Sequence, residues 1–344
     1  MTARSDNHDW LSLIKEETID PDLSICDPHH HLWDYRHERV QPRYLIDEIL
    51  EDVNSGHNIV STVFIECGAM YRSDGPDAMK PVGETEFVNG IAAMSASGLY
   101  GPCRIAAGII GTVNLMLGAQ AGDVLDAHLV AGGGRFRGIR HGATWDASDA
   151  IPNARSNPPQ HLFLEGKFRE GFAQLAPRGL TFEGWCYHPQ MPDLIDLARA
   201  FPDTTIILNH FGGPLGIGPY AGRRDEVFET WRGPIAELAK CPNVVAKLGG
   251  LNMDYNGFGW HEQERPPNSI ELLEATRRYF EHTMDCFGIE RCMFESNFPV
   301  DKLSCSYNVV WNSFKRLTAD YSAAEKAALF HDNAARVYRI GATG

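Results

Sequence analysis

The residues best suited to chemistry form a short run, Asp27-Pro28-His29-His30-His31, at the end of an apolar segment. Successive side chains of a β-strand point to opposite faces, so His29 and His31 share one face and His30 lies on the other. Two neighbouring imidazoles can bind a divalent metal ion or polarise a carbonyl group. A strand end with satisfied hydrogen bonds is the structural alternative, but polar residues at the ends of barrel strands are usually catalytic. We therefore predict an active site around His29 and His31.

Further polar side chains stand where later apolar runs end. They are Arg140, His188, His210 and Asn297. The carboxyl ends of parallel strands meet at one end of a barrel, so we expect these four side chains to gather there. A guanidinium, imidazoles and an amide in one place predict a catalytic site.

The elements that must position these residues are eight short, β-branched apolar runs, separated by segments with helical spacing. This alternation predicts a parallel sheet, and eight strands are the number of a (β/α)8 TIM barrel of the α/β class. We expect a single barrel domain over residues 1–344, with an N-terminal extension over residues 1–22. The expected strands are Leu23–Asp27, Ser61–Glu66, Arg104–Ile110, Phe136–His141, Leu180–Trp185, Thr205–Asn209, Val244–Leu248 and Arg291–Glu295.

Two segments, Ala143–Pro159 and Leu251–Asn268, are too long for simple connections. Loops of this length in a compact domain are usually functional or mobile. Both follow expected strands, which places them at the C-terminal face of the barrel as candidates for covering the substrate. After the last strand, helical spacing predicts helices over Tyr307–Leu317, Ala323–Phe330 and Asn333–Tyr338.

The composition limits the partners. The 31 basic and 45 acidic residues give a net charge of −14, which opposes binding to a phosphate backbone, so we expect no nucleic-acid partner. The eight cysteines lack a C-x-x-C pair and a disulfide-framework spacing, which indicates reduced thiols. The first residues lack an apolar signal segment, and the most apolar stretch, from Ile105 to Leu117, is short and interrupted by glycine. We expect a cytoplasmic protein that neither spans nor binds a membrane.

Taken together, the motifs resemble those of a known family. The motifs are the H-x-H of His29 and His31, Arg140, the N-H-x-G-G-P around His210, the S-N-F-P around Asn297, and the terminal segment 333–338. Their order resembles that of the amidohydrolase-related branch of the amidohydrolase superfamily, from about Ile25 to the C-terminus. The resemblance implies a barrel enzyme similar to lactonases that act on pyrone dicarboxylates, muconolactones and sugar lactones, or to related decarboxylases.

The resemblance also implies roles for single residues. His29, His31 and His210 would surround the substrate carbonyl, and Arg140 would hold a carboxylate or the developing oxyanion. Preorganised donors aimed at an oxyanion contribute about 3 to 4 kcal/mol each in favourable cases. One position departs from the family, whose members usually carry an aspartate where this chain has Asn297. An amide donates and accepts hydrogen bonds but cannot take up a proton.

The base that activates water would then lie elsewhere. Glu295, two residues before Asn297, is expected on the same strand face, where the family more often has glycine. Asp301 is an equal candidate, with the N-terminal cap of the next helix as its structural alternative. Glu66 and Lys247 are the remaining candidates for the base. The structural alternative for each is membership of a buried ion pair.

The histidines leave the metal question open. His29, His31, His188 and His210 offer nitrogen ligands for one zinc ion, and catalytic zinc takes about three protein ligands plus water. The absence of the strand-eight aspartate argues against a two-metal site. We expect either no metal or at most one divalent ion, for which zinc fits best.

The function expected from these residues is hydrolysis of a lactone or related cyclic ester of a carboxylated or polyhydroxylated small molecule. Water would attack a carbonyl that histidine and arginine polarise. The alternatives are metal-dependent nonoxidative decarboxylation of an aromatic or unsaturated acid and a noncatalytic ligand-binding barrel. Substrate contacts are expected from Trp33, Arg72, Trp145, His188 and Trp260. The expected partners are this small-molecule substrate and, as the commonest assembly, a second copy in a homodimer.

Overall fold

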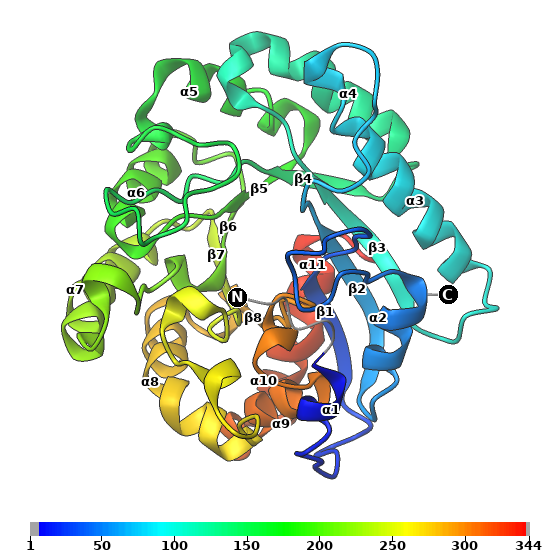
Figure 1. Cartoon of the computed structure of the whole chain (residues 1–344). Helices are drawn as coiled ribbons and strands as arrows, with labels where there is room; N and C mark the ends of the chain where they lie inside the picture. Colours follow the sequence, from blue (N-terminus) through cyan, green and yellow to red (C-terminus); the bar gives the residue numbers. More distant parts are fainter. Residues whose placement is uncertain (1–6, 342–344) are drawn as a thin grey trace.

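Eight parallel strands form one sheet in which each strand pairs with the next along the chain. The computed structural model describes residues 7–341, and in it the predicted (β/α)8 barrel is confirmed (Figure 1). The strands are β1 (Ser24–His30), β2 (Asn58–Ile65), β3 (Arg104–Gly111), β4 (Phe136–Arg140), β5 (Thr181–Gly184), β6 (Ile206–Leu208), β7 (Val244–Leu248) and β8 (Cys292–Phe294).

The sheet closes into a barrel through the residues just after β8. His30 pairs in parallel with Phe298, and the His31 N–H donates to the Phe298 carbonyl at 2.8 Å. The Asn297 N–H donates to the His29 carbonyl at 3.0 Å. Closure therefore brings the first histidine motif and the last strand's motif into direct backbone contact.

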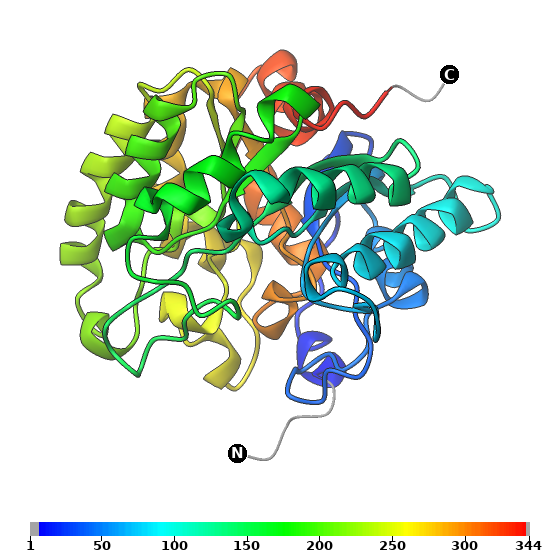
Figure 2. The same ribbon diagram turned by 90° about the horizontal axis from the view of Figure 1, so that it is seen from above.

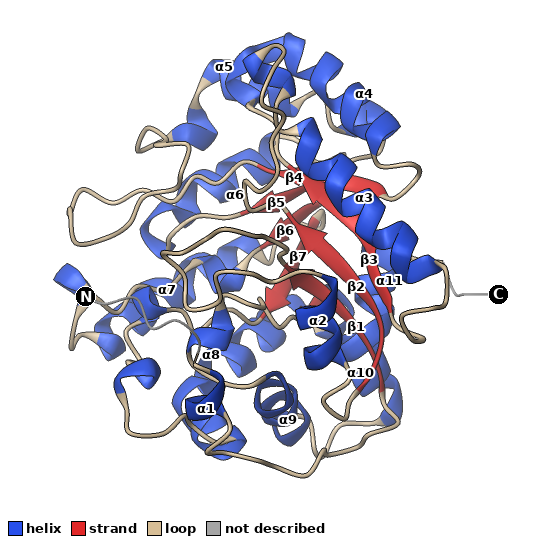
Figure 3. Ribbon diagram, turned by 45° about the vertical axis from the view of Figure 1, so that its right-hand side comes forward, coloured by secondary structure: helices blue, strands red, loops and turns tan. Residues whose placement is uncertain are grey.

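Helices surround the strands (Figure 3). They are α1 (His8–Leu11), α2 (Ile46–Val53), α3 (Val82–Ala96), α4 (Ala121–Ala131), α5 (Gly166–Phe172), α6 (Met191–Ala200), α7 (Arg224–Leu238), α8 (Ser269–Phe287), α9 (Tyr307–Leu317), α10 (Ala323–Ala327) and α11 (Asn333–Val337). Side-chain caps fix several starts. For example, the Asn268 side chain accepts from the N–H groups of Ile270 and Glu271 at the start of α8. None of the helices within residues 7–341 combines the length and apolar character that crossing a bilayer requires.

Successive side chains of a strand point to opposite faces, so every second residue of each strand points into the barrel and fills its interior. Its apolar layer consists of Cys26, Val63, Ile65, Ile110, Ile207, Val245 and Met293. Ala334 and Tyr338, within and just after α11, pack against this layer. Figure 2 shows α11 and α1 at opposite ends of the barrel.

Some predicted boundaries were wrong. The first strand continues to His30, beyond the predicted end at Asp27. The last strand ends at Phe294, because the backbone turns at Asn297, whose φ is +57°. The predicted break near residue 330 lies inside a continuous helical stretch, where a π-helical turn (Ala328–Asp332) joins α10 to α11. The turn keeps its apolar residues Leu329 and Phe330 buried.

Candidate functional site

The histidine run has the predicted alternation. The rings of His29 and His31 lie on the interior side with their centroids 5.0 Å apart. His30 lies on the other side, where its Nε2 is 2.9 Å from Thr62 Oγ1. All three rings are buried. The two interior imidazoles are therefore held at the carboxyl end of β1, next to the segment that closes the barrel.

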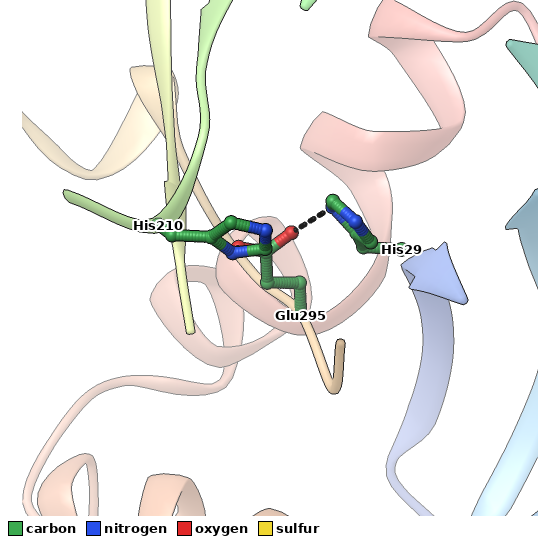
Figure 4. A group of neighbouring side chains, drawn as sticks. All are labelled: His29, His210 and Glu295. Atoms are coloured by element: carbon green, nitrogen blue, oxygen red, sulfur yellow. Dashed lines mark hydrogen bonds and ion pairs between the residues drawn. The ribbon is translucent and has the colours of Figure 1, made fainter. Parts of the chain in front are cut away.

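Glu295 connects His29 with His210 (Figure 4). Its Oε2 lies 2.7 Å from His29 Nδ1, and its Oε1 lies 2.7 Å from His210 Nδ1. Two glycines after β7 leave the space for this group. A Cβ at Gly249 would lie 2.6 Å from Glu295 Cγ, and a Cβ at Gly250 would lie 2.1 Å from His210 Nδ1. Larger side chains at these positions would displace the cluster.

His29, His210 and Glu295 together offer ligand atoms for a metal ion. One ligand atom from each of His29, His210 and Glu295 can be chosen so that all three lie within 4.8 Å of one another. His29 Nε2 is buried and has no hydrogen-bond partner among the described residues. Two imidazoles and a carboxylate are a donor set that catalytic zinc takes. The residues present therefore fit one divalent ion, with Glu295 in a position that the sequence had suggested for a base.

A buried ion pair between Lys247 and Glu183 packs against the cluster of His29, His210 and Glu295. Lys247 Nζ lies 2.9 Å from Glu183 Oε2, 3.3 Å from His29 Nδ1 and 3.8 Å from Glu295 Oε2. Glu183 also accepts from Asn209 Nδ2 at 2.5 Å. Burial first, and the Lys247 charge second, hold the pKa of His29 well below its ordinary value. Lys247 is thus placed as an ion-pair partner, which was the structural alternative considered for it.

A cavity of about 880 Å³ opens over the carboxyl ends of the strands. His31, Arg140, His210 and Asn297 line it, from the ends of β1, β4 and β6 and from the turn after β8. Its outer wall includes residues of both long loops, and neither loop contains an α-helix. Contributions of side chains from several different strand ends are typical of active sites in this fold.

Arg140 is fixed at the cavity wall by Glu66. Its Nε donates to Glu66 Oε1 at 2.8 Å, and its Nη2 donates to the Glu66 carbonyl at 2.6 Å. Its Nη1 makes no hydrogen bond with the described residues. Although burial acts to raise the pKa of Glu66, the guanidiniums of Arg140 and Arg155 outweigh it and lower that pKa. The Glu66 carboxylate is therefore ionised, and Arg140 keeps a free N–H donor at Nη1 for a ligand.

His31 presents an acceptor nitrogen. Its Nδ1 lies 2.8 Å from the Ile65 carbonyl, which can only accept, so the ring proton sits on Nδ1 and Nε2 carries the lone pair. Burial first, and the Arg140 charge second, keep the pKa of His31 well below its ordinary value. The imidazole is thus neutral and can accept a hydrogen bond in the cavity.

The two carboxylates expected to supply a base both lie behind the cavity wall. Glu295 is covered by the imidazoles that it contacts, and neither it nor Asp301 is among the lining residues. Asn297 lines the cavity and donates from Nδ2 to Asp301 Oδ1 at 2.7 Å. Burial raises the pKa of Asp301 to about 7. The carboxyl group of Asp301 therefore orients the amide of Asn297, and neither carboxylate is placed for direct contact with substrate.

Of the residues expected to contact substrate, Trp33 lines the cavity. Four others do not. Arg72 is exposed and paired with Glu86, and Trp145 lies outside the lining. His188 Nδ1 accepts from the Leu215 N–H at 3.3 Å, which removes it from the histidine cluster. Trp260 stacks on Phe258 with ring centroids 5.8 Å apart.

Three site residues were missed in the sequence. Arg36 and Arg155 line the cavity from loops, where a single arginine carries no periodic signal. Glu183 lies in a short, otherwise uncharged strand segment, Thr181-Phe182-Glu183-Gly184. A lone carboxylate in a buried strand was the one signal that could have identified it, since buried charges need partners.

Known proteins resemble the chain over most of its length. The sequence profile of the amidohydrolase family matches residues 26–340. The chain is 34% identical over 337 residues to the uncharacterized protein y4mH of Sinorhizobium fredii, covering 93% of this chain and 99% of the relative. It is 27% identical over 285 residues to an L-fucono-1,5-lactonase of Burkholderia multivorans, covering 79% and 88%. A Burkholderia multivorans amidohydrolase solved with bound zinc has the same fold, with a TM-score of 0.70, 24% identity, and coverage of 92% and 99%.

Proposed function

The chain belongs to the amidohydrolase family, and on that basis we propose that it hydrolyses the ester bond of a lactone. One observation carries the proposal. A fixed guanidinium with a free donor, from Arg140, and a neutral imidazole acceptor, from His31, line the same cavity. Ester hydrolysis needs a donor for the carbonyl oxygen and an acceptor for the proton of water. The relative named as an L-fucono-1,5-lactonase supports the choice of a cyclic ester.

Arg140 would bind the oxygen of the lactone carbonyl through Nη1. The oxygen gains negative charge when water adds to the carbonyl carbon, so a fixed cation stabilises the transition state more than the bound substrate. Because Glu66 already holds two nitrogens of the guanidinium, little reorganisation is needed during the reaction.

His31 would accept a proton from the attacking water at Nε2. The ring C–O bond then breaks, and the same proton passes to the leaving alkoxide, so the product is a hydroxy acid. Asn297, held by Asp301, would orient the water through its carbonyl oxygen. The amide thereby serves for positioning, because it cannot itself take up the proton.

One divalent ion would be held by His29, His210 and Glu295, and zinc suits this donor set best. When bound, zinc supplies a Lewis acid that polarises the ester carbonyl or the attacking water. The chain's own residues prepare the position, since Lys247, which Glu183 holds, contacts both His29 and Glu295.

The metal content of purified protein tests these ligands. We expect about one zinc ion per chain, and less than about a tenth of that in His29→Ala and Glu295→Gln, because each substitution removes one of three ligands. His188→Gln is the matched control and should retain zinc, since its ring faces the Leu215 N–H. Elemental analysis after dialysis measures the outcome. Equal zinc loss in His188→Gln, or full retention in Glu295→Gln, would contradict the assignment.

The proposed activity is tested by following acid release from a panel of lactones in a pH-stat. The panel should contain L-fucono-1,5-lactone and lactones with ring carboxylates. We expect kcat/KM of about 10⁴ M⁻¹s⁻¹ or more for at least one member. Folded, zinc-loaded protein that fails to exceed the uncatalysed rate with every member would refute lactone hydrolysis.

A further inference from the structure

Two arginines from separate loops meet at the cavity wall. Arg36, in the loop after β1, donates from Nη2 to the Cys67 carbonyl, and Arg155, in the loop after β4, donates from Nη1 to the same oxygen. Arg155 also donates from Nη2 to Glu66 Oε2 at 2.8 Å. Gly68 makes this approach possible, because its φ is +74° and a Cβ there would lie 1.6 Å from Arg155 Nη1. We call Arg36 and Arg155 the arginine pair.

The charges around the pair do not balance. Arg140, Arg155 and Arg36 lie close together, and Glu66 forms ion pairs with only the first two. Arg36 has no carboxylate within ion-pair distance among the described residues; its guanidinium lies 5.3 Å from the Trp33 ring centroid.

A further buried carboxyl group, that of Glu84, does not correct this excess. Glu84 accepts hydrogen bonds from the N–H groups of Cys67 and Ala69, and burial followed by the Glu66 charge raises its pKa to about 7. Glu38 and Asp254 line the cavity, but neither pairs with these arginines. Positive charge therefore exceeds negative charge at this wall, and two guanidiniums converge on a single neutral oxygen. Like charges this close are stabilised by an anion between them.

We propose that the arginine pair binds a carboxylate of the substrate, so that the lactone is an anionic one and not a neutral polyhydroxylated one. This inference rests on the proposed lactone hydrolysis. Arginine is suited to the role because its planar donors match a carboxylate bidentately. Arg155 and Arg140 contact opposite oxygens of Glu66, so a substrate carboxylate bound by the arginine pair would sit beside the lactone carbonyl without occupying the Arg140 donor that the carbonyl needs.

A matched pair of small lactones tests the inference: 2-oxo-2H-pyran-5-carboxylate and its methyl ester, which has the same ring without the charge. For the wild type we expect kcat/KM to be about 10- to 100-fold higher for the carboxylate, the range for a lost charge-assisted hydrogen bond. Arg155→Gln and Arg36→Gln should each raise KM for the carboxylate about 10-fold or more and leave the methyl ester within about threefold. Arg199→Gln is the control. The side chain of Arg199 is 54% exposed, as is that of Arg155, and it pairs with one glutamate, but it lies on the surface away from the cavity.

Binding without turnover separates this inference from the proposed function. Calorimetric titration with benzene-1,3-dicarboxylate, a stable planar dianion, should give a Kd about 10-fold weaker in Arg155→Gln and unchanged in Arg199→Gln. If Arg155→Gln weakens dicarboxylate binding and Arg199→Gln does not, but no lactone is turned over, the proposed lactone hydrolysis is refuted while the assignment of the anion site stands. Lactone turnover with equal kcat/KM for the acid and the ester, unaffected by either arginine substitution, would overturn the anion site alone. Arg36→Gln and Arg155→Gln lie on different loops, so misfolding of one leaves the other informative.

Discussion

Replacing Arg140 with alanine is expected to lower kcat/KM for the best lactone about 100- to 1,000-fold, the loss measured when one preorganised oxyanion donor is removed. The fall should appear in kcat, because Nη1 interacts more strongly with the oxyanion of the transition state than with the ground-state carbonyl. Arg140→Lys should recover little, since a lysine cannot bridge Glu66 Oε1 and the Glu66 carbonyl while presenting a third donor. Steady-state kinetics measure each variant.

Loss of stability is the competing explanation, and Glu66 allows it to be separated. Arg140→Ala leaves the buried Glu66 carboxylate with Arg155 as its remaining ion-pair partner, which costs up to about 3 kcal/mol of unfolding free energy. The double variant Arg140→Ala, Glu66→Gln also removes the Glu66 charge, which has lost one of its two arginine partners, and should regain most of that stability in urea unfolding, while activity stays low. Activity that returned together with stability would show that Arg140 has only a structural role.

Replacing His31 with asparagine is expected to lower kcat about 100-fold or more, the usual contribution of a positioned general base. Asparagine can keep the hydrogen bond that His31 Nδ1 donates to the Ile65 carbonyl, but it has no atom in the place of Nε2. KM should change little, because the lost interaction is with water and not with the lactone. Stopped-flow or pH-stat kinetics at saturating lactone measure the effect.

His30 provides the neighbouring control. It is equally buried, but its ring contacts Thr62 and Phe64 on the outer side of β1. His30→Asn should lower the thermal midpoint and leave kcat within about threefold, whereas His31→Asn should show the opposite pattern. Unchanged kcat in a folded His31→Asn protein would transfer the proton acceptor to another residue of the cavity wall.

The strands and the histidine motif could be predicted because their signals are local. Alternation with a period of two placed His29 and His31 on one face, and the structure has them there. Eight apolar runs separated by helical segments were sufficient to predict the eight-stranded barrel, which the structure confirms. The end of β8 was predicted one residue too late, at Glu295, and the turn at Asn297 that follows had no local signal, since its N–H pairs with the carbonyl of His29, a residue distant in the sequence.

The roles of the charged residues required the tertiary structure. Sequence spacing indicated Glu295 and Asp301 as candidates for the base that activates water, but both lie behind residues that line the cavity. His188 was a candidate ligand by residue type alone, and the fold turns it toward a backbone N–H.

The sequence by itself therefore determined the barrel and predicted that His29, His31, Arg140, His210 and Asn297 lie at the carboxyl ends of its strands, where the structure has them. Only the tertiary structure decided which of these meet a carboxylate, which face the cavity, and that Arg36 and Arg155 join them. The physical reason is the sequence separation over which each kind of interaction acts. Periodicity and propensity act over a few residues, whereas ion pairing and burial depend on which loops converge. The loops bearing Arg36 and Arg155 are far apart in the sequence and meet at Cys67 in the folded barrel.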